Sequence, residues 1–394
     1  MRMAQANGSS GSDPYISTDR TMTNDPISKL ELGRPLADHI RRAIRVSYAL
    51  RRVPESSFHC LLPAPEPQSI GDIVLARVES IGKNVALDIS TGRRCALHGG
   101  DLVAVVFGNR YATLQFEAYA RSDDGRCDLL SVGGLCGLVA SKHDSLPEPS
   151  KLRIEGALGD ADGRPLRLQN FAVPEVSTAG LRRPRVAVVL GTAMDVGKTH
   201  TARSVILGLQ RHGVQVAGIK LTGTAAGRDT FTMLDAGACV ALDFVDGGLP
   251  STYLSSLTEL LDLYRLLVNY AALQGAAWVV VEIADGIIQG ETAALLASTR
   301  FASSVDAWLL AANDALGAVG AAGMLRGMGI TPLAVSGVVS RSALGRREVE
   351  ASTKIPCLAA AELEQGLLNA KLMAAAPPAD LKVLSGERAA LSLG

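Results

Sequence analysis

The spacing of apolar residues divides the sequence into two main regions. Between residues 70 and 178, apolar and polar residues alternate over short runs such as Asp72–Val78 and Asn84–Ser90, which glycine-containing turns separate. Alternation with a period of two predicts β-strands with one buried face. From Arg185 onward, nearly continuous apolar runs alternate with stretches of helical periodicity, a pattern typical of a parallel sheet covered on both faces. We therefore predict an α/β fold, with a doubly wound and mostly parallel sheet, preceded by a small β-rich barrel or sandwich.

The expected domain boundaries follow changes in this pattern. Residues 1–27 are rich in Gly, Ser, Asp, Asn and Thr, and we expect a disordered tail there. Residues 28–69 are expected to form a helical segment, with helical spacing over Leu36–Arg52, and a proline-rich linker. The arginines of this segment fit a solvated helix face better than an anion-binding surface. The β-rich domain then spans residues 70–178, the α/β domain 179–363, and a C-terminal tail 364–394.

Strands and helices are expected to alternate along the α/β domain. The expected buried strands are Arg185–Leu190, Gln215–Lys220, Ala277–Glu282, Asp306–Ala311 and Pro332–Val339. The expected helices are His200–His212, Ser256–Leu273, Glu291–Ser298, Leu316–Met328 and, after Pro356, Ala359–Met373. Because the strands are short and apolar throughout, we expect helices on both faces of the sheet.

Composition argues against several classes of function. The 394-residue chain has 39 basic and 39 acidic residues, and its net charge of zero gives no electrostatic case for binding nucleic acid or an anionic membrane. Aromatic residues make up only 4% of the chain, too few for a base-stacking surface. The apolar runs are too short to span a bilayer, and we expect no signal peptide. The six cysteines lack metal-binding spacing and are expected to be reduced thiols of a cytoplasmic protein.

The strongest chemical signal is the segment Gly191–Thr199, Gly-Thr-Ala-Met-Asp-Val-Gly-Lys-Thr, between an expected buried strand and an expected helix. Its glycines let backbone N–H groups and the helix N-terminus face a triphosphate. Lys198 would reach the β- and γ-phosphates, and the Thr199 hydroxyl would bind Mg²⁺. The alternative is an ordinary tight turn with a surface lysine. The expected nucleotide contacts are Gly191, Thr192, Asp195, Val196, Gly197, Lys198, Thr199 and His200.

Two charged residues stand at the carboxyl ends of expected strands, Lys220 after the second and Glu282 after the third. Functional groups collect beyond this edge of a parallel sheet. We expect Glu282 to bind Mg²⁺ directly or through water, because the ion prefers hard oxygen ligands near a triphosphate. We expect Lys220 to hold an anionic acceptor beyond the γ-phosphate. The alternatives are an exposed acid and a surface lysine.

Two loops of the β-rich region are weaker candidates for ligand contact. Gly108–Tyr111 offers amide, guanidinium and phenol groups, and Ser131–Gly137 offers backbone N–H groups. A hairpin turn and a loop that needs glycine conformations explain them at least as well. Both alternatives remain open at this stage.

The phosphate-binding segment resembles the modified loop of dethiobiotin synthetase and the related cobyrinic acid diamide synthases, with five residues between Gly191 and Gly197. Glu282-Ile-Ala-Asp-Gly286 is similar to the family's Val-Glu-Gly-Ala-Gly-Gly segment, and Lys220-Leu-Thr-Gly-Thr224 to its Lys-Pro segment. Three later segments extend the resemblance. They are Ala315–Gly320, Ser336–Arg341 and Ile355–Leu358. The resemblance covers about residues 184–362.

The resemblance implies a Mg·ATP-dependent ligase that phosphorylates a carboxylate or carbamate for capture by a nitrogen nucleophile. Lys198 and Lys220 would be catalytic, and Thr199, Asp229 and Glu282 would hold the metal, with Asp235 a weaker match. The substrate would be a small molecule with a carboxylate and an amine, and the protein a homodimer. Ser340 stands where the family has a base-recognising asparagine. ATP is expected because no Asn-Lys-x-Asp guanine motif is present.

Two other functions fit the same residues. A small-molecule kinase would stop at the phosphorylated product. A regulatory or chaperone NTPase would use its β-rich domain to bind a protein partner. Fold-level analogy alone does not choose among the three.

Overall fold

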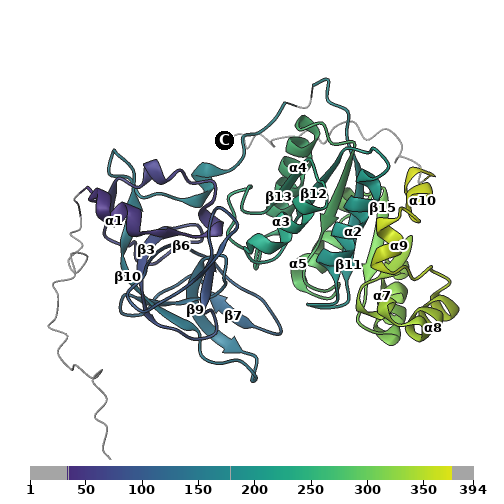
Figure 1. The fold of residues 1–394 in the computed structure, drawn as a ribbon, viewed down its shortest axis with the longest axis horizontal. Helices are drawn as coiled ribbons and strands as arrows, with labels where there is room; N and C mark the ends of the chain where they lie inside the picture. The colour runs from purple at the N-terminus through teal and green to yellow at the C-terminus, as the bar shows by residue number, and fades with distance from the viewer. Residues whose placement is uncertain (1–32, 34, 178, 375–394) are drawn as a thin grey trace, which may run out of the picture. The chain divides into compact units, whose positions relative to one another are not determined.

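The β-rich region is a closed barrel in the computed structural model, which describes residues 33, 35–177 and 179–374. The strands of the barrel are β3 (Ile73–Ser80), β6 (Leu102–Phe107), β8 (Arg126–Leu129), β9 (Leu135–Lys142) and β10 (Ser150–Gly159). They pair in the ring β6–β3–β10–β8–β9–β6, which the parallel β6–β9 pair closes (Figure 1). Of the two predicted β-rich architectures, the barrel is therefore the one that forms.

Alternate residues of the barrel strands meet in its interior, as the period-two pattern predicts. They include Val74, Ala76, Val78, Val103, Val105 and Phe107. Smaller elements complete this region. These are β4 (Ala86–Asp88), β5 (Arg94–Ala96), β7 (Phe116–Tyr119) and the 3₁₀ helices Glu55–Ser57 and Leu168–Phe171.

The segment before the barrel differs from the prediction. The helix expected over Leu36–Arg52 is limited to α1 (Asp38–Ala43), and β1 (Arg45–Val46) then pairs in parallel with β6. The 3₁₀ helix Tyr48–Leu50 and β2 (Cys60–Leu62), which pairs with β10, follow. The helix ends because Ile44 is already extended and pairing with β6 takes over the backbone hydrogen bonds.

The α/β region contains a 6-stranded, fully parallel sheet in the order β13-β12-β14-β11-β15-β16. Its strands are β11 (Arg185–Gly191), β12 (Val216–Lys220), β13 (Val240–Asp243), β14 (Trp278–Glu282), β15 (Ala307–Ala311) and β16 (Ala334–Ser336). Strand β11 lies in the interior of the sheet, so the loop that follows it has strands on both sides. The predicted doubly wound parallel sheet is confirmed.

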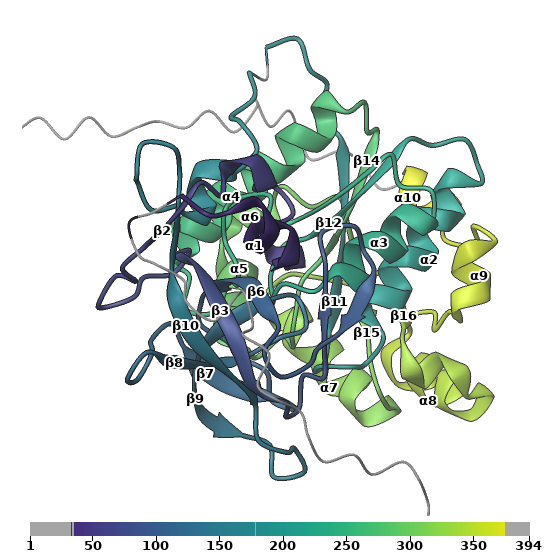
Figure 2. The same ribbon diagram turned by 60° about the vertical axis from the view of Figure 1, so that its left-hand side comes forward.

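Helices cover both faces of this sheet. They are α2 (Lys198–Gln210), α3 (Gly227–Asp235), α4 (Leu257–Leu273), α5 (Gly290–Ala297), α6 (Thr299–Ala302), α7 (Ala315–Gly327), α8 (Ala343–Thr353), α9 (Ala360–Glu364) and α10 (Asn369–Ala374). Ala187 and Val189 of β11 pack in one core with α2 and α3, whereas Val186 and Val188 point to the other face and are also fully buried. Helices α4 and α5 lie on that second side (Figure 2). None of the helices among the described residues is long and apolar enough to cross a membrane.

Some predicted elements differ from the structure at glycines. The strand expected over Pro332–Val339 ends at Ser336, because Gly337 takes a φ of +89° and the 3₁₀ helix Val338–Arg341 follows. The helix expected over Ala359–Met373 is divided into α9 and α10, and Gly366 between them has a φ of +81°. The apolar pattern predicts neither β13 nor α8. The expected N-terminal tail, residues 1–27, lies outside the described residues, and so does the part of the expected C-terminal tail over 375–394.

Candidate nucleotide-binding site

The loop between β11 and α2 has the backbone shape that phosphate binding requires. Asp195 and Gly197 take left-handed φ values of +59° and +98°. A Cβ on Gly197 would lie 3.0 Å from the Cα of Gly337, so both the angle and the space favour glycine. Helix α2 begins at the next residue, and no side chain caps its first N–H groups. These N–H groups and the helix dipole are therefore available to an anion.

Lys198 lies across this loop. Its Nζ donates a hydrogen bond to the carbonyl of Ala193, 2.6 Å away. A Cβ on Gly191 would lie 2.6 Å from the Lys198 side chain, so glycine at the end of β11 makes room for the lysine. Burial lowers the pKa of Lys198, and the Glu282 and Asp285 carboxylates offset part of that effect. The lysine is thus held beside the loop, where a triphosphate would compete with a single carbonyl for its charge.

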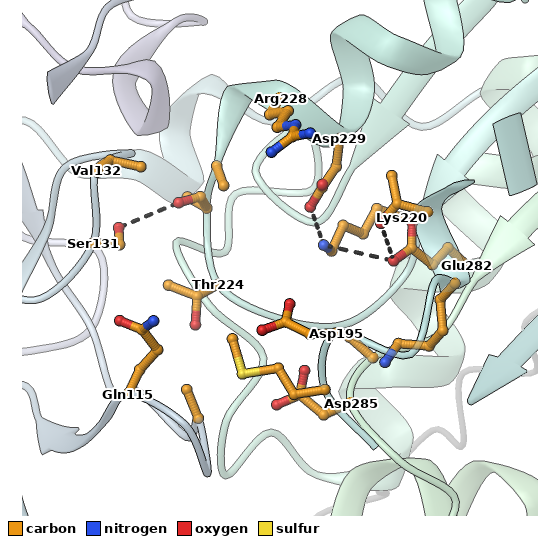
Figure 3. A pocket seen from close by; sticks show the side chains of 18 of the residues that line it. Gln115, Ser131, Val132, Asp195, Lys220, Thr224, Arg228, Asp229, Glu282 and Asp285 are labelled. Atoms are coloured by element: carbon orange, nitrogen blue, oxygen red, sulfur yellow. Dashed lines mark hydrogen bonds and ion pairs between the residues drawn. The ribbon is translucent and has the colours of Figure 1, made fainter. Parts of the chain in front are cut away.

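A continuous set of polar contacts joins the residues that the sequence singled out. The Thr199 hydroxyl donates to Oε1 of Glu282 at 2.8 Å. Nζ of Lys220 lies 3.8 Å from the same oxygen and donates a hydrogen bond to Oδ2 of Asp229 (Figure 3). Strands β12 and β14 pair with Lys220 opposite Glu282, and Asp229 lies in the first turn of α3. Strand β14 therefore lies between Lys220 and the strand that leads into the loop.

Burial controls the charges in this set. Glu282 is 1% exposed, and burial raises its pKa, although Lys220 and Lys198 oppose the effect. Burial by itself would lower the pKa of Lys220, but Asp229 and Glu282 together raise it above its usual value. The second carboxylate oxygen of Glu282, Oε2, is buried without a hydrogen-bond partner in the described chain. A buried carboxylate oxygen without a partner is costly, and a cation beside it would remove that cost.

The residues present fit a Mg²⁺ ion. The free oxygen of Glu282 and the hydroxyl of Thr199 are hard oxygen ligands beside the loop, which is the chemistry that Mg²⁺ requires. No group of three or more His, Cys, Asp or Glu side chains among the described residues could hold a metal by itself. Phosphate oxygens and water would therefore complete the ligand set. Thr199 and Glu282 would hold the ion, which would neutralise charge on the phosphates. Asp229 is instead paired with Lys220.

A pocket of about 550 Å³ lies in front of these residues. One side, which we call the sheet wall, comes from the α/β region and includes Asp195, Lys198, Thr199, Lys220, Arg228, Asp229, Glu282 and Asp285. The other side, which we call the barrel wall, consists of Lys83, Asn84, Arg110, Tyr111, Ala112, Gln115, Ser131 and Val132. Figure 3 shows Gln115, Ser131 and Val132 facing the sheet wall across the pocket. Both loops that the sequence offered as weak candidates thus contribute residues to the pocket.

Some residues expected to contact nucleotide have other places. His200 lines the pocket, and burial lowers its pKa, with Arg203 acting in the same direction. Thr192 and Val196 do not line it: Val196 is buried, and the carbonyl of Val196 accepts from Val338. Asp235 is exposed at the far end of α3. Ser340 bonds the carbonyl of Gly337, at 2.7 Å, rather than lining the pocket.

Sequence reasoning gave no role to several lining residues, among them Asn84, Gln115, Arg228 and Asp285. Asp285 had a signal, since it follows Glu282 in the same strand-end segment. Gly286 in that segment lies so close to the loop that a Cβ would be 2.8 Å from the carbonyl oxygen of Thr192. The barrel residues Asn84 and Gln115 had no such signal, because only the folded chain brings them opposite a loop that is distant in the sequence.

The interior strand, the glycine-bounded loop, the uncapped helix and the strand-end carboxylate define a P-loop nucleotide-binding domain. No protein-family model matches the chain, and no curated protein matches it either. Among solved structures, the chain is similar to the Signal Recognition Particle 54 kDa protein from Aeropyrum pernix K1 in complex with GDP, with 19% identity, a TM-score of 0.33 and 49% of each chain covered.

Two other solved structures resemble the chain at the same level. For chloroplast FtsY from Physcomitrella patens the identity is 17% and the TM-score 0.35, over 48% of this chain and 62% of that one. For a duf1611 family protein from Anabaena variabilis ATCC 29413 the identity is 12% and the TM-score 0.36, over 51% of this chain and 61% of that one. The chain thus spans about half to three fifths of these proteins' lengths. The P-loop assignment rests on the loop and strand geometry described above, and the narrower resemblance to dethiobiotin synthetase stays a prediction.

Proposed function

We propose that this protein transfers the γ-phosphoryl group of a Mg²⁺-bound nucleoside triphosphate, with ATP the default, to a carboxylate or carbamate of a small molecule in the pocket. The observation that carries the proposal is the place of Lys220. It lies at the strand end next to Glu282, faces the same pocket as Lys198, and is held by Asp229. A cation in this position supports the acceptor anion next to the transferred group.

Each residue has a task that its position supports. The loop N–H groups and Lys198 bind the phosphates and stabilise charge that develops on the transferred group. Thr199 and Glu282 hold the metal. Lys220 orients the acceptor oxygen, which attacks the γ-phosphorus while the bond to the bridging β–γ oxygen breaks and the nucleoside diphosphate leaves. Asp229 keeps Lys220 charged and in place.

The ligase form of the proposal adds a second step. An amine nitrogen attacks the carbonyl carbon of the acyl phosphate, and inorganic phosphate leaves as the carbon–nitrogen bond forms. The small-molecule substrate would then bear a carboxylate and an amine. The pocket supports this form because its sheet wall and barrel wall enclose polar groups of both charges.

A nucleotide-turnover assay tests the proposal. Release of ADP or GDP is measured with Mg²⁺ and either triphosphate, first alone, then with a panel of small carboxylic acids, then with acids and amines together. Acid-dependent release supports phosphoryl transfer, and release that also needs an amine supports the ligase. Turnover that no acid stimulates would contradict both.

A regulatory NTPase is the second candidate, and one set of contacts favours it. Helix α3 carries Asp229 at the pocket, and its next residue, Thr230, bonds the Tyr48 hydroxyl at 2.6 Å. Tyr48 also donates to Asp243 at the end of β13, at 2.7 Å. Helix α3 therefore contacts both the nucleotide site, through Asp229, and the segment before the barrel, through Thr230. Slow hydrolysis by the protein alone, accelerated by a protein and not by any acid, would favour this function.

A further inference from the structure

Arg110 is the one residue of the barrel wall whose burial and charge conflict. It follows Asn109 in the loop after β6, where its backbone bridges Ala118. It is only 8% exposed, and it lines the pocket. Its guanidinium carbon lies 5.7 Å from the centre of the Phe116 ring. An arginine buried to this degree is normally paired with an acid.

No such partner is present in the part of the chain that the structure describes. The side chain of Arg110 forms no hydrogen bond or ion pair there, and its Nε is buried without a partner. Burial lowers its pKa to about 10, and Asp285 on the sheet wall only partly offsets this. Asp285 is close enough to attract Arg110 but does not form a salt bridge with it. The guanidinium of this pocket-lining residue thus has donors that no described residue uses.

The charges of the two walls differ in a way that gives this arginine a ligand. The acidic lining residues, Asp195, Asp229, Glu282 and Asp285, all belong to the sheet wall. The barrel wall combines the cations Lys83 and Arg110 with neutral polar groups, and no acid is among its described residues. An anion between the walls would therefore meet cations on the barrel side, where the competing carboxylate for Arg110 is Asp285 of the sheet wall.

We infer that the barrel wall is the acceptor site of the proposed phosphotransfer, and that Arg110 binds a carboxylate of a small organic acid there. The statement that the bound acid is phosphorylated rests on the proposed function. The statement that Arg110 binds the acid does not. A guanidinium matches a carboxylate through two parallel N–H···O bonds. Arg110 would hold one carboxylate of the acceptor, while the reacting oxygen on the acceptor's other anionic group points to Lys220. The acceptor is then a molecule with two anionic ends, such as a short dicarboxylate or an acidic amino acid.

The alternative occupant of Arg110 is the γ-phosphate of the nucleotide itself. On the sheet wall, Lys198 and the loop N–H groups are already available to the phosphates, and a Mg²⁺ ion held by the free oxygen of Glu282 would add to them. Arg110 comes from the opposite wall of the pocket, and its loop belongs to a different region of the chain from the phosphate-binding loop. The acceptor is therefore the better match, and the experiment separates the two.

Calorimetry with defined probes tests the inference. Succinate, glutarate and glutamate are titrated into the full chain with Mg²⁺ and a non-hydrolysable ATP analogue, each beside its uncharged diamide. At least one acid is expected to bind, and its diamide, which lacks both carboxylates (the diamide of glutamate keeps its ammonium group), is not. Arg110→Gln should weaken that binding by about tenfold or more, and Arg110→Lys should weaken it less. Arg93→Gln, an exposed arginine of the same region outside the pocket, is the matched control.

Fluorescent MANT-ATP binding is measured on the same variants. Unchanged MANT-ATP affinity in Arg110→Gln supports an acceptor role, and a parallel loss would assign Arg110 to the nucleotide and overturn the inference. Binding of none of the acids to the wild-type chain, or equal binding by Arg110→Gln, would also overturn it. Lys198→Ala separates the two proposals: it should lose MANT-ATP and keep the acid, and retained MANT-ATP would instead contradict the proposed function.

Discussion

On the sheet wall of the pocket, Lys220 lies between Asp229 and Glu282, whereas on the barrel wall Arg110 has no ionic partner among the described residues. Arg110 is buried, the Lys220 side chain is 12% exposed, and both residues line the same pocket. The paired lysine belongs to a network that is complete except for one oxygen of Glu282. Arg110 has no such network, and a bound anion would supply the partner that it lacks. This difference is what our proposals predict if the sheet wall binds a phosphate and a metal and the barrel wall binds a second ligand.

Lys198→Ala should give the largest effect and act on the sheet wall alone. We expect turnover to fall by on the order of 10³-fold, because charge on the transferred group loses its main cation. The fold should survive, because Lys198 forms no ion pair with any residue that the structure describes. An ADP-release assay with circular dichroism measures both. Lys371→Ala, an exposed lysine of α10, is the control. A native-like Lys198→Ala protein with full turnover would contradict the P-loop function.

Lys220→Met should damage both activity and stability. Acceptor-dependent turnover should fall by about 10²-fold, or roughly 3 kcal/mol of transition-state stabilisation. The free energy of unfolding should fall by about 3 kcal/mol, because Asp229 and Glu282 lose their buried partner. Adding Asp229→Asn should restore part of the stability but not the activity. Nucleotide affinity should change little, and an equal loss there would assign Lys220 to the nucleotide.

Glu282→Gln tests the one incomplete position of the sheet wall. The amide keeps the shape and loses the charge, so the Mg²⁺ concentration for half-maximal turnover should rise about tenfold. Binding of MANT-ATP in the absence of Mg²⁺ should be unchanged. Glu348→Gln on the exposed side of α8 serves as the control. A Mg²⁺ titration identical to that of the wild type would return Glu282 to a purely structural role.

The two walls also differ in how far the sequence could predict them. Lys220 and Glu282 were predicted because the apolar pattern locates the ends of strands, and parallel strands place their ends at one edge. Lys198 was predicted from the glycine-bounded segment Gly191–Thr199. The Lys220–Asp229 pair could not be found, since it depends on where α3 begins. For the barrel wall, the sequence offered two loops as weak candidates for ligand contact but did not place them opposite the nucleotide site. Arg110 and Ser131 lie in loops whose turn chemistry is visible locally, while their burial depends on packing against the sheet.

The contact between the regions is a further case. Arg51 was expected on a solvated helix, yet it bonds Asp243 at 2.9 Å and its guanidinium lies 4.3 Å from the centre of the Tyr48 ring. The arginine-rich composition of Leu36–Arg52 suggested exposure. Only the pairing of β1 with β6 turns these side chains toward the end of β13. A charged residue in a sequence reports its charge, but its burial depends on partners that are distant in the chain.

Tyr48→Phe would loosen this contact between the two walls' regions. Tyr48 is fully buried, and its hydroxyl bonds both Thr230 and Asp243. Losing it should lower the free energy of unfolding by about 1–3 kcal/mol, because buried polar groups lose a partner. Urea denaturation measures the change, and Tyr270→Phe on α4, whose hydroxyl has no side-chain hydrogen bond in the described chain, should be nearly neutral. Equal stability of the two variants would mean that this contact contributes little.

Arg110→Met should give the smallest effect, and it has the opposite sign to Lys220→Met. Without ligand, the buried guanidinium is charged and unpaired, so an apolar side chain of similar length should raise the free energy of unfolding by about 0.5–1 kcal/mol. The gain should disappear when a bound dicarboxylate stabilises the wild type and leaves the variant unchanged. Thermal unfolding of both proteins, with and without glutarate, shows whether the ligand removes the stability advantage of the variant. A variant less stable than the wild type without any ligand would mean that Arg110 already has a structural partner, and the contrast between the walls would then be lost.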